Sequence, residues 1–159
     1  METALEVKDL TKLYKNGRGV SDISFTVEKG DIVGLLGPNG SGKTTVMKTV
    51  MGLIHGNSGS VTIFGNDIEG DVEKALEKVG GLIERPAIFE YMTARKNLEM
   101  TASLYQGIGK ERIDRVLEMV RLTKYQNEKC GKFSLGMKQR LGLALALLSE
   151  PELVILDEP

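Results

Sequence analysis

The sequence predicts an α/β fold, in which short apolar strands alternate with helices around a single core. Two observations carry this prediction. A glycine-rich loop at residues 37–44 lies between an apolar run at 32–36 and a helix-compatible run at 44–53. Near the other end of the chain, a second apolar run at 153–156 leads directly into two adjacent carboxylates. Short runs that are apolar throughout are typical of strands buried on both faces of a parallel sheet.

The remaining elements follow in order along the chain. Strands come first, and after the loop and its helix the pattern predicts a strand at 60–64 and a strand-like run at 79–83. A mainly helical stretch extends from about residue 93 to 122. At its end, apolar residues spaced i, i+3, i+4, i+7 predict an amphipathic helix at 110–122. These residues are Ile113, Val116, Leu117 and Val120. The mixed charges on the opposite face indicate a solvated surface or a partner-binding one.

The glycine-rich loop matches the complete pattern G-x-x-x-x-G-K-[ST] of a phosphate-binding loop. It consists of Gly37, Pro38, Asn39, Gly40, Ser41, Gly42, Lys43 and Thr44. Glycines let successive backbone N–H groups point at a polyphosphate, and the following helix adds the favourable potential of its N-terminus. Lys43 is placed to reach the β- and γ-phosphates, and the Thr44 hydroxyl to coordinate Mg²⁺. The pattern therefore predicts a nucleoside triphosphate site, with a simple glycine-rich turn as the alternative.

The apolar run at 153–156 ends in Asp157 and Glu158. Downstream of a phosphate loop, such a strand has the Walker B arrangement, in which it carries Asp157 towards the Mg²⁺ ion. Glu158, one residue further, is placed to polarise an attacking water. Two carboxylates that only cap a solvent-exposed turn are the alternative, and the upstream loop favours the Walker B interpretation.

Residues 133–140 read Phe-Ser-Leu-Gly-Met-Lys-Gln-Arg and precede an apolar run at 141–148. Ser134 is a good N-cap, and the N–H groups of a first helical turn suit a phosphate, although an ordinary capped core helix has the same pattern. Here the chain resembles the ATP-binding cassette (ABC) ATPases, whose LSGGQxQR signature opens a helix shortly before the Walker B strand. It keeps Ser134, Gly136, Gln139 and Arg140 and departs at Phe133, Leu135 and Met137. The variant is most similar to that of exporters that confer resistance to bacitracin and lantibiotic peptides.

The resemblance covers the full chain and implies its architecture. It implies a P-loop NTPase core of the ABC ATPase type, with N-terminal antiparallel strands and an inserted helical subdomain. Residues 1–159 would form a single domain, with the nucleotide-binding core at about 1–85 and 150–159 and the helical subdomain, signature helix included, at about 86–149. Family members continue well past Pro159, so the C-terminal part of the core is expected to be missing. The absent strand would leave apolar edges exposed in the sheet.

Two further site residues follow from the resemblance. Tyr14 stands where these ATPases place an aromatic residue that stacks on adenine, and a tyrosine that packs on its own sheet is the alternative. Glu84 stands where the family usually has a glutamine that senses the γ-phosphate and Mg²⁺. A glutamate keeps an oxygen for the metal but loses the amide donor. The histidine that contacts the γ-phosphate in the family has no counterpart here, because His55 lies in the loop after the phosphate-loop helix.

The predicted site can then be stated by role. The catalytic residues are Lys43 and Glu158. The Mg²⁺ ligands are Thr44, Glu84 and Asp157. The residues predicted to contact ATP are Tyr14, Gly37, Pro38, Asn39, Gly40, Ser41, Gly42, Lys43, Thr44, Thr45, Glu84, Ser134 and Gly136.

The resemblance implies the ATP-binding subunit of an ABC transporter, which binds and hydrolyses Mg-ATP to power export, with antimicrobial peptides or drugs as the expected cargo. Two such domains would form a homodimer around two ATP molecules, the signature of one acting on the nucleotide of the other. A membrane-spanning permease subunit would contact the region of residues 83–92 and hold the protein at the cytoplasmic face of the cell membrane. The alternatives are a nucleotide-binding but hydrolytically inactive fragment and a soluble, non-transport ABC ATPase.

Composition agrees with a globular domain. The 159 residues are 41% hydrophobic and 27% charged, with a formal net charge of −1. That charge argues against general nucleic-acid binding, which normally requires a basic surface. The apolar run at 141–148 is far shorter than the roughly 20 residues of a membrane-spanning helix. Cys130 is the single cysteine, which excludes a disulfide within the chain and favours a reducing compartment.

Overall fold

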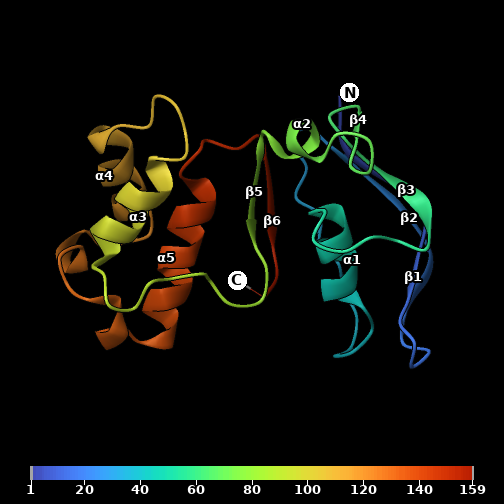
Figure 1. Ribbon diagram of the computed structural model, residues 1–159, viewed down its shortest axis with the longest axis horizontal. Coiled ribbons are helices and arrows are strands. Elements are labelled where there is room, and N and C mark those ends of the chain that lie inside the picture. The colour runs from blue at the N-terminus through green and yellow to red at the C-terminus, as the bar shows by residue number, and fades with distance from the viewer. Residues whose placement is uncertain (1, 159) are drawn as a thin grey trace. The chain divides into compact units, whose positions relative to one another are not determined.

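The computed structural model describes residues 2–158, and its strands fall into two separate sheets. The chain divides into two units, Met1–Glu77 and Lys78–Pro159, and each unit contains one of the sheets (Figure 1). The finer division predicted from the sequence, a core at about 1–85 and 150–159 and a helical subdomain at about 86–149, stays a prediction.

The first unit is built on an antiparallel sheet. Its strand order is β2-β1-β3-β4, which confirms the predicted N-terminal antiparallel strands. The elements are β1 (Thr3–Leu13), β2 (Gly19–Glu28), α1 (Lys43–Val50), β3 (Ser58–Ile63), β4 (Asn66–Asp67) and α2 (Val72–Leu76). The predicted strand at 60–64 corresponds to β3, and the predicted helix at 44–53 corresponds to α1.

The core of this unit lies on one face of the sheet. Val7 and Val61 are paired across β1 and β3, and both are buried together with Ile63. From α1, Val46 and Val50 are buried four residues apart, which is the spacing of one helical face. Burial of this apolar stripe holds α1, and therefore the loop before it, in place.

The predicted strand at 32–36 is wrong. Residues 32–36 have no strand structure, and the ladders given for the described residues pair none of them. Ile32 is fully exposed and Leu36 is 93% exposed. A strand is stabilised by hydrogen bonds to neighbouring strands, so an apolar run without a partner does not become one. The apolar residues of a run can suggest a strand, but they do not show whether a neighbouring strand is present to pair with it.

The second unit combines a short parallel sheet with three α-helices. Its elements are β5 (Val79–Leu82), α3 (Ala94–Ala102), α4 (Lys110–Met119), the 3₁₀ turns η1 (Thr123–Tyr125) and η2 (Cys130–Lys132), α5 (Leu135–Leu147) and β6 (Leu153–Leu156). The strands predicted at 79–83 and 153–156 are confirmed as β5 and β6, which pair in parallel. The predicted burial of 153–156 on both faces is wrong, because all four residues of β6 are only half-buried beside their one partner strand.

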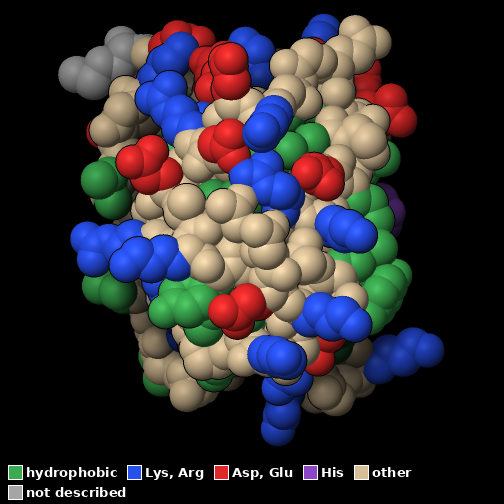
Figure 2. Space-filling view, turned by 90° about the vertical axis from the view of Figure 1, so that its left-hand side faces the viewer, with side chains coloured by type: hydrophobic (Ala, Val, Ile, Leu, Met, Phe, Trp, Pro, Cys, Tyr) green, Lys and Arg blue, Asp and Glu red, His purple; other side chains and the backbone are tan. Residues whose placement is uncertain are grey.

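The helices of the second unit share one apolar core. Leu98 from α3, Leu117 from α4, and Leu141 and Leu148 from α5 and its end are fully buried in it. In α4, Ile113, Val116 and Leu117 face this core as the sequence predicts, while the opposite face is charged. Figure 2, seen from the side of α3 and α4, shows acidic and basic side chains interspersed on the surface.

The predicted helix at 110–122 ends earlier, at Met119, for a local reason. Arg121 has a φ of 58°, in the left-handed region. Its N–H donates to the Glu118 carbonyl at 2.9 Å, and the Leu122 N–H donates to the Leu117 carbonyl at 2.8 Å. This pair of bonds is a Schellman motif, which satisfies the last carbonyls and stops the helix, and the buried Leu122 packs back on the core.

The strand β5 lies directly against α5. A Cβ added at Gly80 would lie 2.1 Å from the Ala146 carbonyl oxygen, and one at Gly142 would lie 2.5 Å from Pro86 Cβ. Both positions therefore require glycine for close packing rather than for backbone freedom. The contact joins the helix that follows Ser134 to the strand that precedes Glu84.

Among the described residues, no helix combines the length and the apolar character needed to cross a bilayer.

Candidate functional site

The phosphate loop of the first unit is shaped by hydrogen bonds to its own lysine. The Lys43 ammonium donates to the Gly37 carbonyl at 2.8 Å and to the Pro38 carbonyl at 3.1 Å. The Ser41 N–H donates to the Pro38 carbonyl at 3.1 Å and closes a tight turn within the loop. Because Lys43 is the first residue of α1, these bonds tie the loop to the start of the helix.

Two glycines give the loop its path. Gly40 has a φ of 83° and Gly42 a φ of 97°, and a side chain is strained at either angle. A Cβ at Gly42 would also lie 2.2 Å from Val20 Cγ1, so the loop contacts the start of β2 there. By contrast, nothing lies within 4 Å of the Cβ position of Gly40. The loop is therefore close-packed on the β2 side and open at Gly40.

The first turn of α1 has no side-chain cap. Gly42 is the N-cap, and no side chain caps the helix or contributes an acid in this turn. The first intrahelical bond is the 3.0 Å bond from the Val46 N–H to the Gly42 carbonyl. Lys43, Thr44 and Thr45 form the first turn of this helix, and the amides of a first helical turn point away from the helix body, towards any group bound at its start. This is the arrangement that binds phosphate.

Tyr14 lies in the turn between β1 and β2, at the same end of the sheet as the phosphate loop. Its N–H donates to the Arg18 carbonyl at 2.7 Å, and the preceding Leu13 pairs with Gly19. The Gly19 carbonyl lies 3.4 Å from the Cβ position at Gly42. Tyr14 is 42% exposed, and the Lys12 ammonium lies 5.5 Å from the centroid of its ring. Its exposure leaves the ring available to a ligand.

The predicted carboxylates of the second unit emerge from neighbouring strand ends. Leu82 pairs with Leu156, and the Asp157 N–H donates to the Leu82 carbonyl at 2.9 Å. Glu84 and Asp157 follow the carboxyl ends of the parallel strands β5 and β6, where ligands of α/β sheets bind. Asp157 is buried, at 8% exposure, whereas Glu158 beside it is exposed. Glu84 and Glu158 have φ values of 62° and 46°, which are uncommon for residues with a side chain.

Ser134 caps α5 as the sequence predicts. Its hydroxyl oxygen accepts from the Met137 N–H at 3.3 Å, and its carbonyl accepts from the Lys138 N–H at 3.0 Å. Nothing lies within 4 Å of a Cβ built at Gly136, and the neighbouring Leu135 is exposed. The start of α5 is therefore open at Gly136 and exposes the Leu135 side chain.

One buried polar residue was missed by the sequence analysis. Asn97 in α3 is 1% exposed, and its side-chain amide accepts from the Phe89 N–H at 2.8 Å and donates to the Thr93 carbonyl at 2.9 Å. It fixes the turn that presents the aromatic pair Phe89 and Tyr91, whose rings meet edge to face with centroids 5.9 Å apart. In the sequence, the only signal for this buried position was that an asparagine stands next to the apolar Leu98.

Cys130 is buried beside Asn97. Burial raises the pKa of its thiol, which keeps it unreactive.

The chemistry of the predicted metal ligands fits Mg²⁺. Thr44 offers a hydroxyl oxygen, and Glu84 and Asp157 offer carboxylate oxygens, which are the hard donors that Mg²⁺ prefers. Thr44 belongs to the first unit and the two carboxylates belong to the second. Within the first unit, Thr44 lies at the start of α1, which suits a polyphosphate. Within the second unit, Glu84 and Asp157 lie at the ends of the β5–β6 pair, which suit a metal.

A phosphate loop at the start of a helix, together with carboxylates at the ends of parallel strands, defines the class of P-loop NTPases. Within that class, a family model described as "ABC transporter" matches residues 20–159. The chain belongs to the ABC transporter family.

Named relatives refine this assignment. The chain is 45% identical over 159 residues to the bacitracin transport ATP-binding protein BcrA of Bacillus licheniformis, covering 100% of this chain and 52% of BcrA. It is 35% identical over 155 residues to the lantibiotic transport ATP-binding protein SrtF of Streptococcus pyogenes, covering 98% of this chain and 66% of SrtF. The chain therefore spans about half the length of BcrA. The predicted resemblance to bacitracin and lantibiotic exporter ATPases is confirmed.

A solved structure supports the fold. The dimeric, post-hydrolysis structure of the ATP-binding cassette MJ0796 bound to ADP and Pi matches with a TM-score of 0.85 at 26% identity, over 98% of this chain and 74% of that one. The predicted fold class, an ABC ATPase core of the P-loop NTPase type, is confirmed.

Proposed function

We propose that this chain forms part of the ATP-binding subunit of an ABC exporter, which binds and hydrolyses Mg-ATP. The observation that carries the proposal is the phosphate loop, where Lys43 and the uncapped start of α1 present cationic and amide donors together. An ATP-binding module needs this combination, and a simple glycine-rich turn does not.

The residues divide the work of phosphoryl transfer. Lys43 and the loop amides bind the β- and γ-phosphates, and the exposed Tyr14 ring stacks on adenine. Thr44, Asp157 and Glu84 would hold Mg²⁺, which neutralises phosphate charge when it is bound. Glu158 accepts a proton from the attacking water. Catalysis by such a site consists mainly of positioning and charge stabilisation.

Membership of the family supports a proposal for the partners and the location. We propose that two copies form a homodimer in which Ser134 and Gly136 of one copy contact the nucleotide held by the other. A membrane-spanning permease subunit would bind near residues 83–92, where Phe89 and Tyr91 are exposed. This contact would hold the protein at the cytoplasmic face of the membrane. Cargo of the bacitracin or lantibiotic peptide type is supported by the printed names of BcrA and SrtF.

The test is a titration of Mg-ATP onto the full-length protein, with binding followed by calorimetry, mass by light scattering and turnover by phosphate release. We expect binding, ATP-driven dimers and turnover in the wild type. Lys43→Ala should weaken binding by about 100-fold or more, because it removes a charged donor to the phosphates. Lys74→Ala, an exposed lysine on α2, is the matched control.

The same experiment separates the alternatives. Binding without phosphate release would favour a hydrolytically inactive protein, and the absence of ATP binding would refute the proposal. Tight binding to RNA or DNA at physiological salt would favour a non-transport ABC ATPase instead.

A further inference from the structure

Arg112, on the charged face of α4, contacts the end of α5 and the residues that follow it. Its guanidinium donates through Nε to the Leu148 carbonyl at 3.1 Å and through Nη2 to the Leu147 carbonyl. Nη1 forms an ion pair with Glu150 at 3.0 Å. The side chain is only 16% exposed. A residue that the amphipathic pattern assigns to a solvated face is therefore largely buried against another helix.

The contacts lie at the C-terminal end of α5, where carbonyls lack intrahelical partners. The negative end of the helix dipole is also located there, so a cation is stabilised by it. The planar guanidinium fork can reach two carbonyls and a carboxylate at once, which an ammonium group cannot do with the same geometry. Arg112 thus caps α5 from a neighbouring helix.

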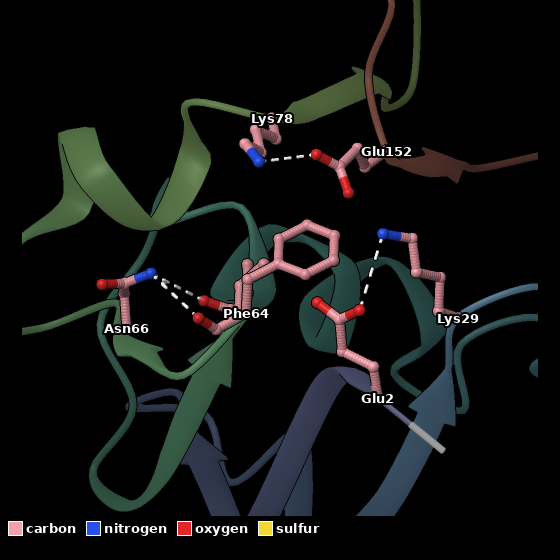
Figure 3. A network of polar contacts seen from close by, with 7 residues as sticks. Glu2, Lys29, Phe64, Asn66, Lys78 and Glu152 are labelled. Carbon is pink, nitrogen blue, oxygen red and sulfur yellow. Dashed lines mark hydrogen bonds and ion pairs between the residues drawn. The ribbon is translucent and has the colours of Figure 1, made fainter.

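The connection from α5 to β6, residues 148–152, is held at its other end by Lys78, the residue before β5. The Glu152 N–H donates to the Lys78 carbonyl at 2.9 Å, and the Lys78 ammonium forms an ion pair with the Glu152 carboxylate at 2.6 Å (Figure 3). Within the connection, the Glu150 N–H donates to the Leu147 carbonyl at 3.2 Å, and Glu150 has a φ of 55°. This short segment is therefore fixed on both sides.

The connection joins α5 to β6, and the proposed function uses residues at the far ends of both elements. Ser134 lies at the start of α5, and Asp157 and Glu158 follow β6. We infer that Arg112 is a positioning residue, which makes α5 and β6 move as one body and so keeps the signature and the Walker B carboxylates in a fixed relation. The inference rests on the proposed function.

The test compares four variants of the full-length protein in steady-state ATP hydrolysis. Arg112→Ala should lower kcat about tenfold, because small displacements away from the chemistry reduce turnover strongly. The KM for ATP should stay within about twofold, since the phosphate loop lies in the other unit. Arg112→Lys keeps the charge without the fork, so we expect a partial loss of about threefold. Arg115→Ala, an exposed arginine on the same helix, is the matched control.

The fourth variant separates capping from the ion pair. Glu150→Gln removes the carboxylate charge but leaves both carbonyl contacts of Arg112 in place. Because Glu150 is exposed, we expect kcat within about twofold of the wild type. A loss equal to that of Arg112→Ala would refute capping as the cause.

Amide hydrogen exchange gives an independent readout of the connection. In Arg112→Ala, the Glu150 and Glu152 amides should exchange about tenfold faster, while the Val46 amide of α1 is unchanged. Unchanged exchange at Glu150 and Glu152, a kcat equal to that of Arg115→Ala, or a parallel rise in KM would each overturn the inference. A wild type without turnover would refute the proposed function and the catalytic role of Arg112 with it, while faster exchange in the variant would still establish the structural contact.

Discussion

The helices α1 and α5 begin in opposite ways, although both starts are predicted to bind phosphate. At α1 the N-cap is Gly42 in a left-handed conformation, and no side chain caps the helix. At α5 the N-cap is Ser134, whose hydroxyl oxygen accepts from the Met137 N–H. The first start has no side-chain cap, whereas at the second start a side chain satisfies the Met137 amide.

The difference shows what each start can offer. A serine hydroxyl has one donor and two acceptor positions, so Ser134 can cap α5 and still donate its proton to a phosphate oxygen. The α1 start offers several amides and the charge of Lys43. We therefore expect α1 to supply most of the affinity for ATP and α5 to act at assembly and turnover.

The largest expected effect separates binding from chemistry. Glu158→Gln should lower turnover about 1000-fold, because the amide cannot accept a proton from water, while ATP affinity stays unchanged. Rapid-quench measurement of phosphate release together with calorimetry checks this. Glu99→Gln, an exposed glutamate on α3, is the control. If Glu158→Gln lowered the affinity for ATP as well as turnover, binding and chemistry would not be divided between the two units.

A pair of glycines tests whether the loop at α1 binds phosphate. Gly40 and Gly17 have φ values of 83° and 76°, and nothing lies within 4 Å of either Cβ position. Alanine at each should cost a similar free energy of unfolding, about 1 kcal/mol, from the same backbone strain. Only Gly40→Ala should weaken ATP binding, by about tenfold or more, because it lies in the phosphate loop. Equal affinities in the two variants would contradict the site.

The stacking role of Tyr14 predicts a smaller loss. Tyr14→Ala should raise the Kd for ATP about tenfold, the size expected for one aromatic residue stacked on a base. Tyr14→Phe keeps the ring and should bind nearly as the wild type does. If Tyr14→Ala instead lowers the melting temperature without changing the Kd, the tyrosine only packs on its own sheet.

The smallest expected effect compares two helix caps. Ser134 caps α5, and Thr93 caps α3 by accepting from the Lys96 N–H at 3.2 Å. Alanine at either position should lower the free energy of unfolding by about 1 kcal/mol in urea titrations. Only Ser134→Ala should also weaken the ATP-driven dimer. A dimer equally sensitive to both changes would indicate general destabilisation, and α5 would then have no separate role in assembly.

Local patterns predicted most elements that the structure contains. The glycine loop predicted α1 behind it, the spacing of Ile113 and Val116 predicted the buried face of α4, and Ser134 was recognised as a cap. Each of these signals lies within a few residues, where backbone geometry and side-chain periodicity determine the outcome. The family assignment followed from the same short motifs.

Features that depend on distant partners were not predicted. The run at 32–36 is apolar like β6, yet only β6 has a partner strand among the described residues. Arg112 and the Leu147 carbonyl are 35 residues apart, and a side chain that caps a distant helix leaves no periodic signal in the sequence. Whether Glu84, Asp157 and Glu158 act on ATP bound at the phosphate loop stays a prediction, because motif spacing alone does not determine catalytic geometry.

The hydrogen bonds of Lys43 to Gly37 and Pro38 have a consequence for selectivity among anions. An ammonium has three N–H donors, so an anion that takes two or more of them must displace at least one of these carbonyl oxygens. Chloride or bicarbonate, with a single charge and few contacts, offers little in exchange, whereas a triphosphate offers several oxygens to the ammonium and to the amides together. We therefore expect the loop to discriminate against the abundant small anions of a cell while remaining folded between one nucleotide and the next.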